Sequence, residues 1–200
     1  MSAGFGWILL AVLVYGVVHS ILASLGVKAR ARQWLGAKGM RFYRLGFNGF
    51  AGLSLLVVLY LVARLPDAPL YAIPLPWVVL TGAIQGVCVV CFLLALSHTG
   101  ARDFLGLDVL LHPAQPAAPQ RLATAGFYRW MRHPLYFFGL VILWLMPVMT
   151  WNILAFSLGA TAYIIIGALV EERKLLLEFG TAYAEYQRRT PFLIPFFKSK

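Results

Sequence analysis

Long apolar stretches separated by short polar segments dominate this chain. Five stretches can be marked, and they cover roughly residues 5–24, 47–63, 77–96, 135–149 and 153–170. The first and third are about 20 residues long, which is enough for an α-helix to cross the ~30 Å hydrocarbon core of a bilayer. The fourth is short for a crossing, so we expect flanking residues to extend it. The pattern predicts an all-α integral membrane protein with five transmembrane helices.

The composition agrees with this interpretation. Of the 200 residues, 61% are hydrophobic and 12% are charged, which excludes an ordinary soluble domain. The first apolar stretch has no basic segment before it and no clear cleavage site after it, so we read it as a membrane helix rather than a signal peptide. The formal net charge of +10 is concentrated in short loops. That placement favours a role in membrane orientation over nucleic-acid binding.

The positions of the basic residues predict the orientation in the membrane. Six lie between the first two stretches, four lie before the fourth stretch, and six lie in the tail: Lys28, Arg30, Arg32, Lys38, Arg41 and Arg44; Arg102, Arg121, Arg129 and Arg132; and Arg173, Lys174, Arg188, Arg189, Lys198 and Lys200. Only Arg64 falls between the second and third stretches. Because Lys and Arg concentrate in cytoplasmic loops, the N-terminus is predicted to be outside and the C-terminus in the cytoplasm.

A basic, aromatic segment, residues 121–139, leads into the fourth stretch. Its centre is a proline that follows a histidine, and proline suits the first turn of a helix while restricting the residue before it. We therefore expect His133 to cap a helix that begins at Pro134. The unpaired N–H groups of such a helix end bind anions, and Arg129 and Arg132 would strengthen the site.

Two adjacent carboxylates, Glu171 and Glu172, follow the fifth stretch. The predicted topology places them on the same cytoplasmic face as Pro134, so we expect the two clusters to face each other. Carboxylates at a helix C-terminus are unfavourable with the helix dipole, so a positive group should compensate them. That group is either a neighbouring Lys or Arg or a ligand with positive charge or ribose hydroxyls. The tail from residue 171 is predicted to form a charged cytoplasmic helix that ends at Pro191.

Two histidines lie near the predicted cytoplasmic ends of apolar stretches, His19 and His98. An ionisable residue at membrane depth is a functional candidate. Each also has a plain structural interpretation, since His98 stands at a helix end and the hydroxyl of Ser20, beside His19, can bond back to its own helix. Haem ligation is disfavoured because both lie near one membrane face, and no metal site is expected. Glycine-rich phosphate-binding motifs are absent from the sequence.

Other small residues occur inside the third stretch. Cys88 and Cys91 form a C-V-V-C pair, which we interpret as small apolar residues in preference to a redox pair. Gly82 and Gly86 form a G-x-x-x-G pattern that suits close packing against another helix, either of this chain or of a second copy. The oligomeric state therefore stays open.

Five spaced motifs in the second half of the chain resemble those of the integral-membrane methyltransferases. They are Leu122-Ala-Thr-Ala-Gly126-Phe-Tyr128, Arg132-His133-Pro134-x-Tyr136, Glu171-Glu172-Arg173-x-Leu175, Phe179-Gly180-x-x-Tyr183-x-x-Tyr186 and Pro191-x-x-x-Pro195. This superfamily includes isoprenylcysteine carboxyl methyltransferase and the phospholipid N-methyltransferases. Residues around Pro147 and Tyr163 look most similar to the bacterial methanethiol S-methyltransferase and NnrU-like branch.

The resemblance implies a cytoplasmic pocket for S-adenosyl-L-methionine as the methyl donor, in a protein of the bacterial inner membrane. Carried over by motif position, the residues that would hold the donor are Gln120, Arg121, Leu122, Ala123, Tyr128, His133, Pro134, Leu135, Tyr136, Glu171 and Glu172. The expected organisation is a single membrane methyltransferase domain, residues 1–200, with its cofactor-binding half at about residues 98–197.

One position departs from the carboxyl methyltransferases, which resemble one another in having an arginine one helical turn before the first glutamate. Here that position is Gly167. Without the guanidinium, a carboxylate acceptor loses its natural charge partner. The sequence therefore favours a neutral or thiol acceptor over a prenylated cysteine carboxylate.

The resulting hypothesis is methyl transfer from S-adenosyl-L-methionine to a small or lipophilic acceptor, best a thiol, that enters from membrane lipid. His19 or His98 would remove the proton of a thiol. The alternatives are carboxyl or lipid amine methylation, a non-catalytic NnrU-like accessory protein, and a thiol-redox protein that uses Cys88 and Cys91. The sequence does not name the acceptor.

Overall fold

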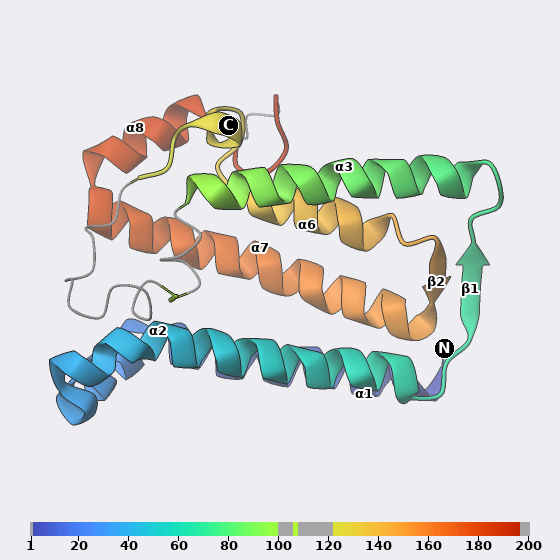
Figure 1. Cartoon of the computed structure of the whole chain (residues 1–200), viewed down its shortest axis with the longest axis horizontal. Coiled ribbons are helices and arrows are strands. Elements are labelled where there is room, and N and C mark those ends of the chain that lie inside the picture. The colour runs from blue at the N-terminus through green and yellow to red at the C-terminus, as the bar shows by residue number, and fades with distance from the viewer. Residues whose placement is uncertain (1, 100–105, 108–121, 197–200) are drawn as a thin grey trace. The chain divides into compact units, whose positions relative to one another are not determined.

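The computed structural model describes residues 2–99, 106–107 and 122–196 (Figure 1). The described chain forms six α-helices, one short 3-10 helix and two short strands. In order they are α1 (Ala3–Ala23), α2 (Leu25–Arg64), β1 (Pro69–Ala72), α3 (Trp77–His98), η1 (Gly126–Arg129), α6 (Pro134–Trp144), β2 (Val148–Thr150), α7 (Trp151–Phe179) and α8 (Thr181–Arg189). The helical class expected from the sequence is confirmed.

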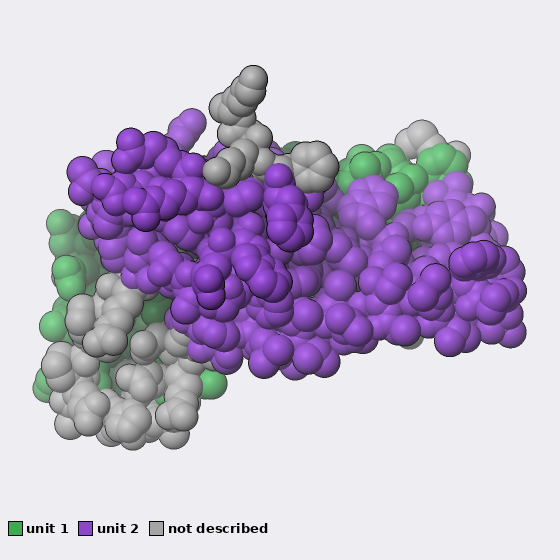
Figure 2. All heavy atoms as spheres, turned by 90° about the horizontal axis from the view of Figure 1, so that it is seen from above, with its two compact units in different colours: residues 1–68, 100–119, 150–159 green, residues 69–99, 120–149, 160–200 purple. Residues whose placement is uncertain are grey.

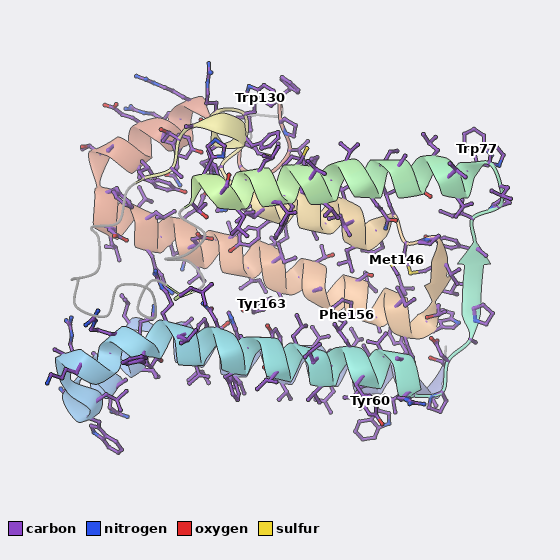
Figure 3. All side chains as sticks on the ribbon, viewed as in Figure 1. Tyr60, Trp77, Trp130, Met146, Phe156 and Tyr163 are labelled. Carbon is purple, nitrogen blue, oxygen red and sulfur yellow. The ribbon has the colours of Figure 1, made fainter. Side chains whose placement is uncertain are left out.

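Four helices, α1, α2, α3 and α7, are long and apolar enough to cross a membrane. The helix α6, with 11 residues, is shorter. Large apolar and aromatic side chains cover the outer surface of these helices; Tyr60 on α2 and Trp77 on α3 project outward and are each 60% exposed (Figure 3). Such a surface is unfavourable in water and suits contact with lipid. The protein is a multi-pass membrane protein.

The chain divides into two compact units (Figure 2). The first contains residues 1–68, 100–119 and 150–159, and the second contains residues 69–99, 120–149 and 160–200. The continuous helix α7 therefore contributes its first turns to the first unit and the remainder to the second.

In the first unit, α1 packs along α2. The buried core consists of Ile8 and Val12 of α1, Val58 of α2 and Ala155 of α7. Gly159 allows this packing, because a Cβ there would lie 2.8 Å from a methyl carbon of Val12.

A polar cluster closes one end of the first unit. Asn152 is fully buried, and its side-chain amide donates to the carbonyls of Val62 and Leu65 at the end of α2. The Asp67 side chain accepts from the backbone N–H of Asn152. The hydroxyl of Ser2 donates to the side-chain oxygen of Asn152. The two bonds from the Asn152 amide satisfy carbonyls that the end of α2 leaves without partners.

The segment between the first two apolar stretches, residues 26–46, was expected to be a loop, and this expectation is wrong. The helix α2 begins at Leu25, with Ser24 as its cap, and runs for 40 residues. The segment has no proline and is rich in Ala, Arg, Lys and Leu, which favour helix. Only Gly36, at φ 63°, departs from helical geometry, and there α2 bends.

The second unit contains α3 packed along α6. The strands β1 and β2 pair at one end of it (Figure 1). The expected extension of the fourth stretch to residue 149 does not occur as helix: α6 ends at Trp144. Pro147 explains this end, since it lacks an N–H and disfavours the α region at Met146. The backbone instead turns into β2.

The last two helices also differ from expectation. The helix α7 continues to Phe179, and Gly180, at φ 53°, separates it from α8. Glu171 and Glu172 therefore lie inside α7, about two turns before its end, and the argument that placed them at a helix C-terminus is wrong. Pro191 follows the end of α8, as predicted.

Candidate functional site

The start of α6 has the geometry that the sequence predicted. His133 is the N-cap, at φ −123°, and Pro134 is the first helical residue. The backbone N–H groups of Arg132 and His133 donate to the carbonyls of Pro191 and Phe192, at 2.9 and 3.2 Å. The segment after α8 is therefore bound to the segment before α6, which fixes the entrance to the helix.

The carboxylate of Glu172 lies at the centre of the cluster and is buried, with 8% of the residue exposed. One of its oxygens, Oε1, accepts from Nε of Arg132, Nε2 of His133 and the hydroxyl of Tyr183, at 2.5, 3.2 and 3.3 Å. The other, Oε2, accepts from Arg132 and from the side chain of Gln187, at 3.2 and 3.0 Å. Five donors leave little lone-pair capacity for a ligand.

The guanidinium of Arg132 connects this cluster to α8. Besides its paired bonds to Glu172, its guanidinium donates to the carbonyls of Gln187 and Thr190 at the end of α8, at 3.0 and 2.7 Å. Its cation lies 5.6 Å from the ring centre of Phe192. Most donors of Arg132 are therefore bonded within the protein, and its contribution to anion binding stays a prediction.

The neighbouring carboxylate, Glu171, has a different environment. Its side chain is 46% exposed. The hydroxyl of Tyr136 donates to its Oε2 at 2.8 Å, while Nδ1 of His133 lies 3.9 Å from the same oxygen. Its other oxygen accepts no hydrogen bond from the described residues. Of the two glutamates, Glu171 is the one with room for a ligand.

Aromatic side chains lie beside the two carboxylates. The rings of His133 and Tyr136 stack, with centres 5.3 Å apart. Burial raises the pKa of the Tyr128 phenol, and the nearby charge of Glu171 raises it further. The pKa of Tyr183 is raised by burial and then by Glu172. Both phenols therefore stay protonated near neutral pH, and that of Tyr183 donates to Glu172.

His98 joins the site through Gly126, at the beginning of η1. Gly126 has φ 60°, and a Cβ there would lie 2.8 Å from Nε2 of His98. Nδ1 of the ring lies 2.7 Å from the carbonyl of Leu94. A carbonyl only accepts, so Nδ1 carries the proton, and Nε2 has its lone pair in the neutral ring. The structure thus places a potential base against the loop that leads to Tyr128.

The remaining predicted residues divide into three groups. Leu122 and Ala123 are half-buried in the loop before η1, whereas Gln120 and Arg121 lie outside the described residues. His19 belongs to the first unit, where its ring lies 4.7 Å from that of Phe47. Cys88 and Cys91 of α3 are not in a disulfide. Within the described chain, no group of three or more His, Cys, Asp or Glu side chains could hold a metal ion.

An open groove of about 770 Å³ runs along α8. Its lining includes Arg132, Glu185 and Arg188, but none of the residues predicted to hold the donor. We therefore locate the candidate site at Glu171 and the start of α6.

Sequence reasoning missed the partners that α8 supplies. Tyr183 and Gln187 are four residues apart and lie on one helix face, from which both reach Glu172. Tyr186 donates to the carbonyl of Tyr128 at 2.6 Å. The available signal was the i, i+3, i+4 spacing of these side chains in a polar helix, together with the need of a buried carboxylate for donors.

The fold and this cluster define a helical membrane protein with a polar site at the start of a short helix. Over residues 7–190 the chain matches the family described as "Protein of unknown function (DUF1295)". The chain belongs to this family.

Several relatives carry a functional name. The chain is 31% identical over 199 residues to methanethiol S-methyltransferase 1 of Bradyrhizobium diazoefficiens. The aligned region covers 96% of this chain and 67% of that protein. Methanethiol S-methyltransferases of Crocosphaera subtropica and Mycobacterium tuberculosis are 38% and 43% identical over 41% and 34% of this chain, which is 32% and 28% of their own lengths. No solved structure matches. The predicted membrane-methyltransferase branch is confirmed.

Proposed function

We propose that this protein transfers a methyl group from S-adenosyl-L-methionine to a small thiol. The relatives named methanethiol S-methyltransferase support the reaction class. The observation that carries the assignment of the site is the half-exposed carboxylate of Glu171, beside Tyr136 and the start of α6.

The residues present fit such a donor. The N–H groups of Leu135 and Tyr136, in the first turn of α6, find no acceptor among the described residues, so they suit its carboxylate. Glu171 suits its ammonium or ribose hydroxyls. When bound, the donor supplies an electrophilic methyl group on a sulfonium. We propose that Leu122, Ala123, Tyr128, His133 and Pro134 shape this pocket, with Gln120 and Arg121, and that Glu172 positions them.

His98 is our preferred base for the thiol proton. Its Nε2 can accept the proton while Nδ1 stays bonded to Leu94. His19 is kept as the second candidate. If His98→Ala and His19→Ala each retained wild-type turnover between pH 6 and 9, neither would be the base.

We also propose a fifth crossing, formed by α6 and the chain up to β2. Arg132, before α6, binds Glu172 near the C-terminal end of α7, so these two points lie on one side of the membrane. The start of α7 at Trp151 lies across the membrane from Glu172 if α7 spans it, which requires the chain between Arg132 and Trp151 to cross. With the basic residues on the inner side of these five crossings, we propose a cytoplasmic site and C-terminus, an external N-terminus and a bacterial inner-membrane location.

The domain assignment remains our proposal: residues 1–200 form one methyltransferase domain, with the donor bound by about residues 98–197. The family match across residues 7–190 and the sharing of α7 by both units support it.

The test combines binding and turnover in the detergent-purified protein. Calorimetric titration with S-adenosylhomocysteine should show saturable binding. Radiolabelled donor should then transfer its methyl group to methanethiol in preference to an amine or a prenylated cysteine. Binding without turnover on any acceptor would favour an accessory protein, and absence of binding by a folded sample would overturn the assignment.

A further inference from the structure

An apolar groove of about 490 Å³ lies within the first unit, and none of its lining residues belongs to the candidate donor site. It is lined by one residue of α1 and seven of α2: Leu22, Leu35, Gly39, Phe42, Tyr43, Gly46, Phe47 and Phe50. The α2 residues beyond the bend recur every three or four positions, so they form one helix face. The volume lies within the usual range of ligand pockets, about 300–1,000 Å³.

Two features keep this groove hollow and apolar. At Gly46 an added Cβ would meet nothing within 4 Å, so the helix leaves space there. The hydroxyl of Tyr43 donates to the carbonyl of Leu22 at 2.7 Å. This bond satisfies a carbonyl in the last turn of α1 and turns the polar end of Tyr43 away from a ligand.

Basic residues border the apolar face. Lys38 and Arg41 directly precede the lining residues Gly39 and Phe42, and Arg44 directly follows Tyr43. Lys38 and Arg44 are exposed. Residues 25–46 contain six Lys and Arg and no Asp or Glu. The apolar membrane-crossing part of α2 follows immediately, so the groove and its basic border lie where a bilayer meets water.

We infer that this groove binds one acyl chain of an anionic phospholipid, with the phosphate of its headgroup held by the basic border. Positive side chains at a membrane surface attract anionic lipids, at about 1 kcal/mol for each Lys or Arg. A second copy of the chain is a poor occupant, because it would bring the same basic segment against this one. A zwitterionic lipid would fill the groove but gain little from the border.

Native mass spectrometry of the detergent-purified full chain tests the inference, with dioleoyl phosphatidylglycerol and dioleoyl phosphatidylcholine as probes. Because the two lipids share their acyl chains, a difference in retention reports the headgroup. The wild-type protein should retain phosphatidylglycerol at least fivefold better, the factor that corresponds to about 1 kcal/mol.

Two matched substitutions test the acyl site. Gly46→Leu fills the groove, whereas Gly49→Leu adds the same side chain to the same helix outside the lining and also meets nothing within 4 Å. Retention of both lipids should fall at least fivefold in Gly46→Leu and stay at the wild-type level in Gly49→Leu. Equal loss in both variants would overturn the acyl site.

Lys38→Gln tests the border separately. Lys38 is exposed, so this variant should fold even if Gly46→Leu does not, as judged by circular dichroism and elution volume. Retention of phosphatidylglycerol should fall about fivefold, with phosphatidylcholine unchanged. Unchanged phosphatidylglycerol retention in Lys38→Gln, or equal retention of the two lipids by the wild-type protein, would overturn the inference.

Discussion

Two adjacent glutamates of α7 differ in burial: Glu172 is buried and Glu171 is half-exposed. This difference suggests that Glu172 stabilises the site, whereas Glu171 binds the ligand. Glu172 is buried under five donors from Arg132, His133, Tyr183 and Gln187. Glu171 is half-exposed and bonded to Tyr136 alone among the described side chains, with His133 at 3.9 Å. Neighbours along a helix differ by about 100° in direction, so Glu172 points into the cluster that includes α8, while Glu171 points toward Tyr136 of α6.

We expect matched substitutions to separate these roles. Glu171→Gln should weaken S-adenosylhomocysteine binding about tenfold or more, since a hydrogen bond to a charged group is worth about 1.5–3 kcal/mol, with little effect on thermal stability. Glu172→Gln leaves the Arg132 guanidinium uncompensated, which costs roughly 3–5 kcal/mol. At about 2 °C per kcal/mol, its melting temperature should fall by about 6 °C or more.

Calorimetry and a thermal melt of the two purified variants provide the measurement. A Glu172→Gln protein that melts like the wild type would contradict its structural role. Wild-type affinity in Glu171→Gln would remove that carboxylate from the donor site.

Gly126 offers a second test at this scale. Its φ of 60° costs a residue with a Cβ about 1–2 kcal/mol, and the new atom would lie 2.8 Å from Nε2 of His98. Gly126→Ala should therefore displace the His98 ring and lower kcat for thiol methylation about tenfold or more. Gly139→Ala, whose added Cβ meets nothing within 4 Å, is the control and should keep the wild-type rate.

The double variant Gly126→Ala/His98→Ala distinguishes a steric effect from a chemical one. Removing the ring relieves the clash, so thermal stability should recover towards that of His98→Ala. Activity should stay low because the base is absent. Recovery of activity would show that His98 is not required for proton removal.

The helix α6 is too short to cross a bilayer alone. At 1.5 Å per residue its 11 residues span about 16 Å, so its C-terminal carbonyls lie at membrane depth if the helix starts at the surface. Unpaired carbonyls are costly there. The side chain of Gln85 on α3 donates to the carbonyl of Ile142 at 2.9 Å and supplies one missing partner.

Gln85→Leu should therefore destabilise the protein by about 0.6 kcal/mol and by no more than about 1.7 kcal/mol, the mean and the maximum for hydrogen bonds between membrane helices. Thr81→Val is the control on the same helix, because among the described residues the Thr81 hydroxyl bonds to carbonyls of its own helix alone, those of Trp77 and Val78. Unfolding in sodium dodecyl sulfate reports both free energies. Equal losses in the two variants would contradict the role of Gln85 as a cap of α6.

Prediction from sequence succeeded for helices whose ends are determined by their own sequence and not by contacts with other elements. The predicted stretches 5–24 and 77–96 differ from α1 and α3 by a few residues, since length and apolarity set both. Prediction failed for residues 26–46, because a charged composition beside a membrane helix is compatible both with a loop and with a helix. It also could not place α8 on Glu172, since that contact depends on the turn at Gly180 and on burial, which a local pattern does not contain.

At the scale of the whole molecule, the charge distribution and the contacts lead to the same topology by independent arguments. Sixteen of the 17 basic residues, all but Arg64, fall on one side if the chain crosses five times. If α7 spans the membrane, the bond between Arg132 and Glu172 requires the chain from α6 to β2 to cross as well, as proposed above. With four crossings, the six basic residues of the tail would face outward and this bond would join opposite sides of the membrane.

Cysteine labelling of intact cells with an impermeant maleimide tests this topology. In a background in which Cys88 and Cys91 are replaced by Ala, Tyr71→Cys in β1 should react from outside, because the Tyr71 side chain is exposed and β1 follows the second crossing. Trp34→Cys, at a position 84% exposed in the basic part of α2, should react only after the cells are opened. A cysteine at Leu177, 82% exposed near the end of α7, should behave like the one at Trp34. Labelling of Leu177→Cys in intact cells, with Trp34→Cys still protected, would mean that α6 does not cross and would refute both the five-crossing topology and the cytoplasmic position of Glu171.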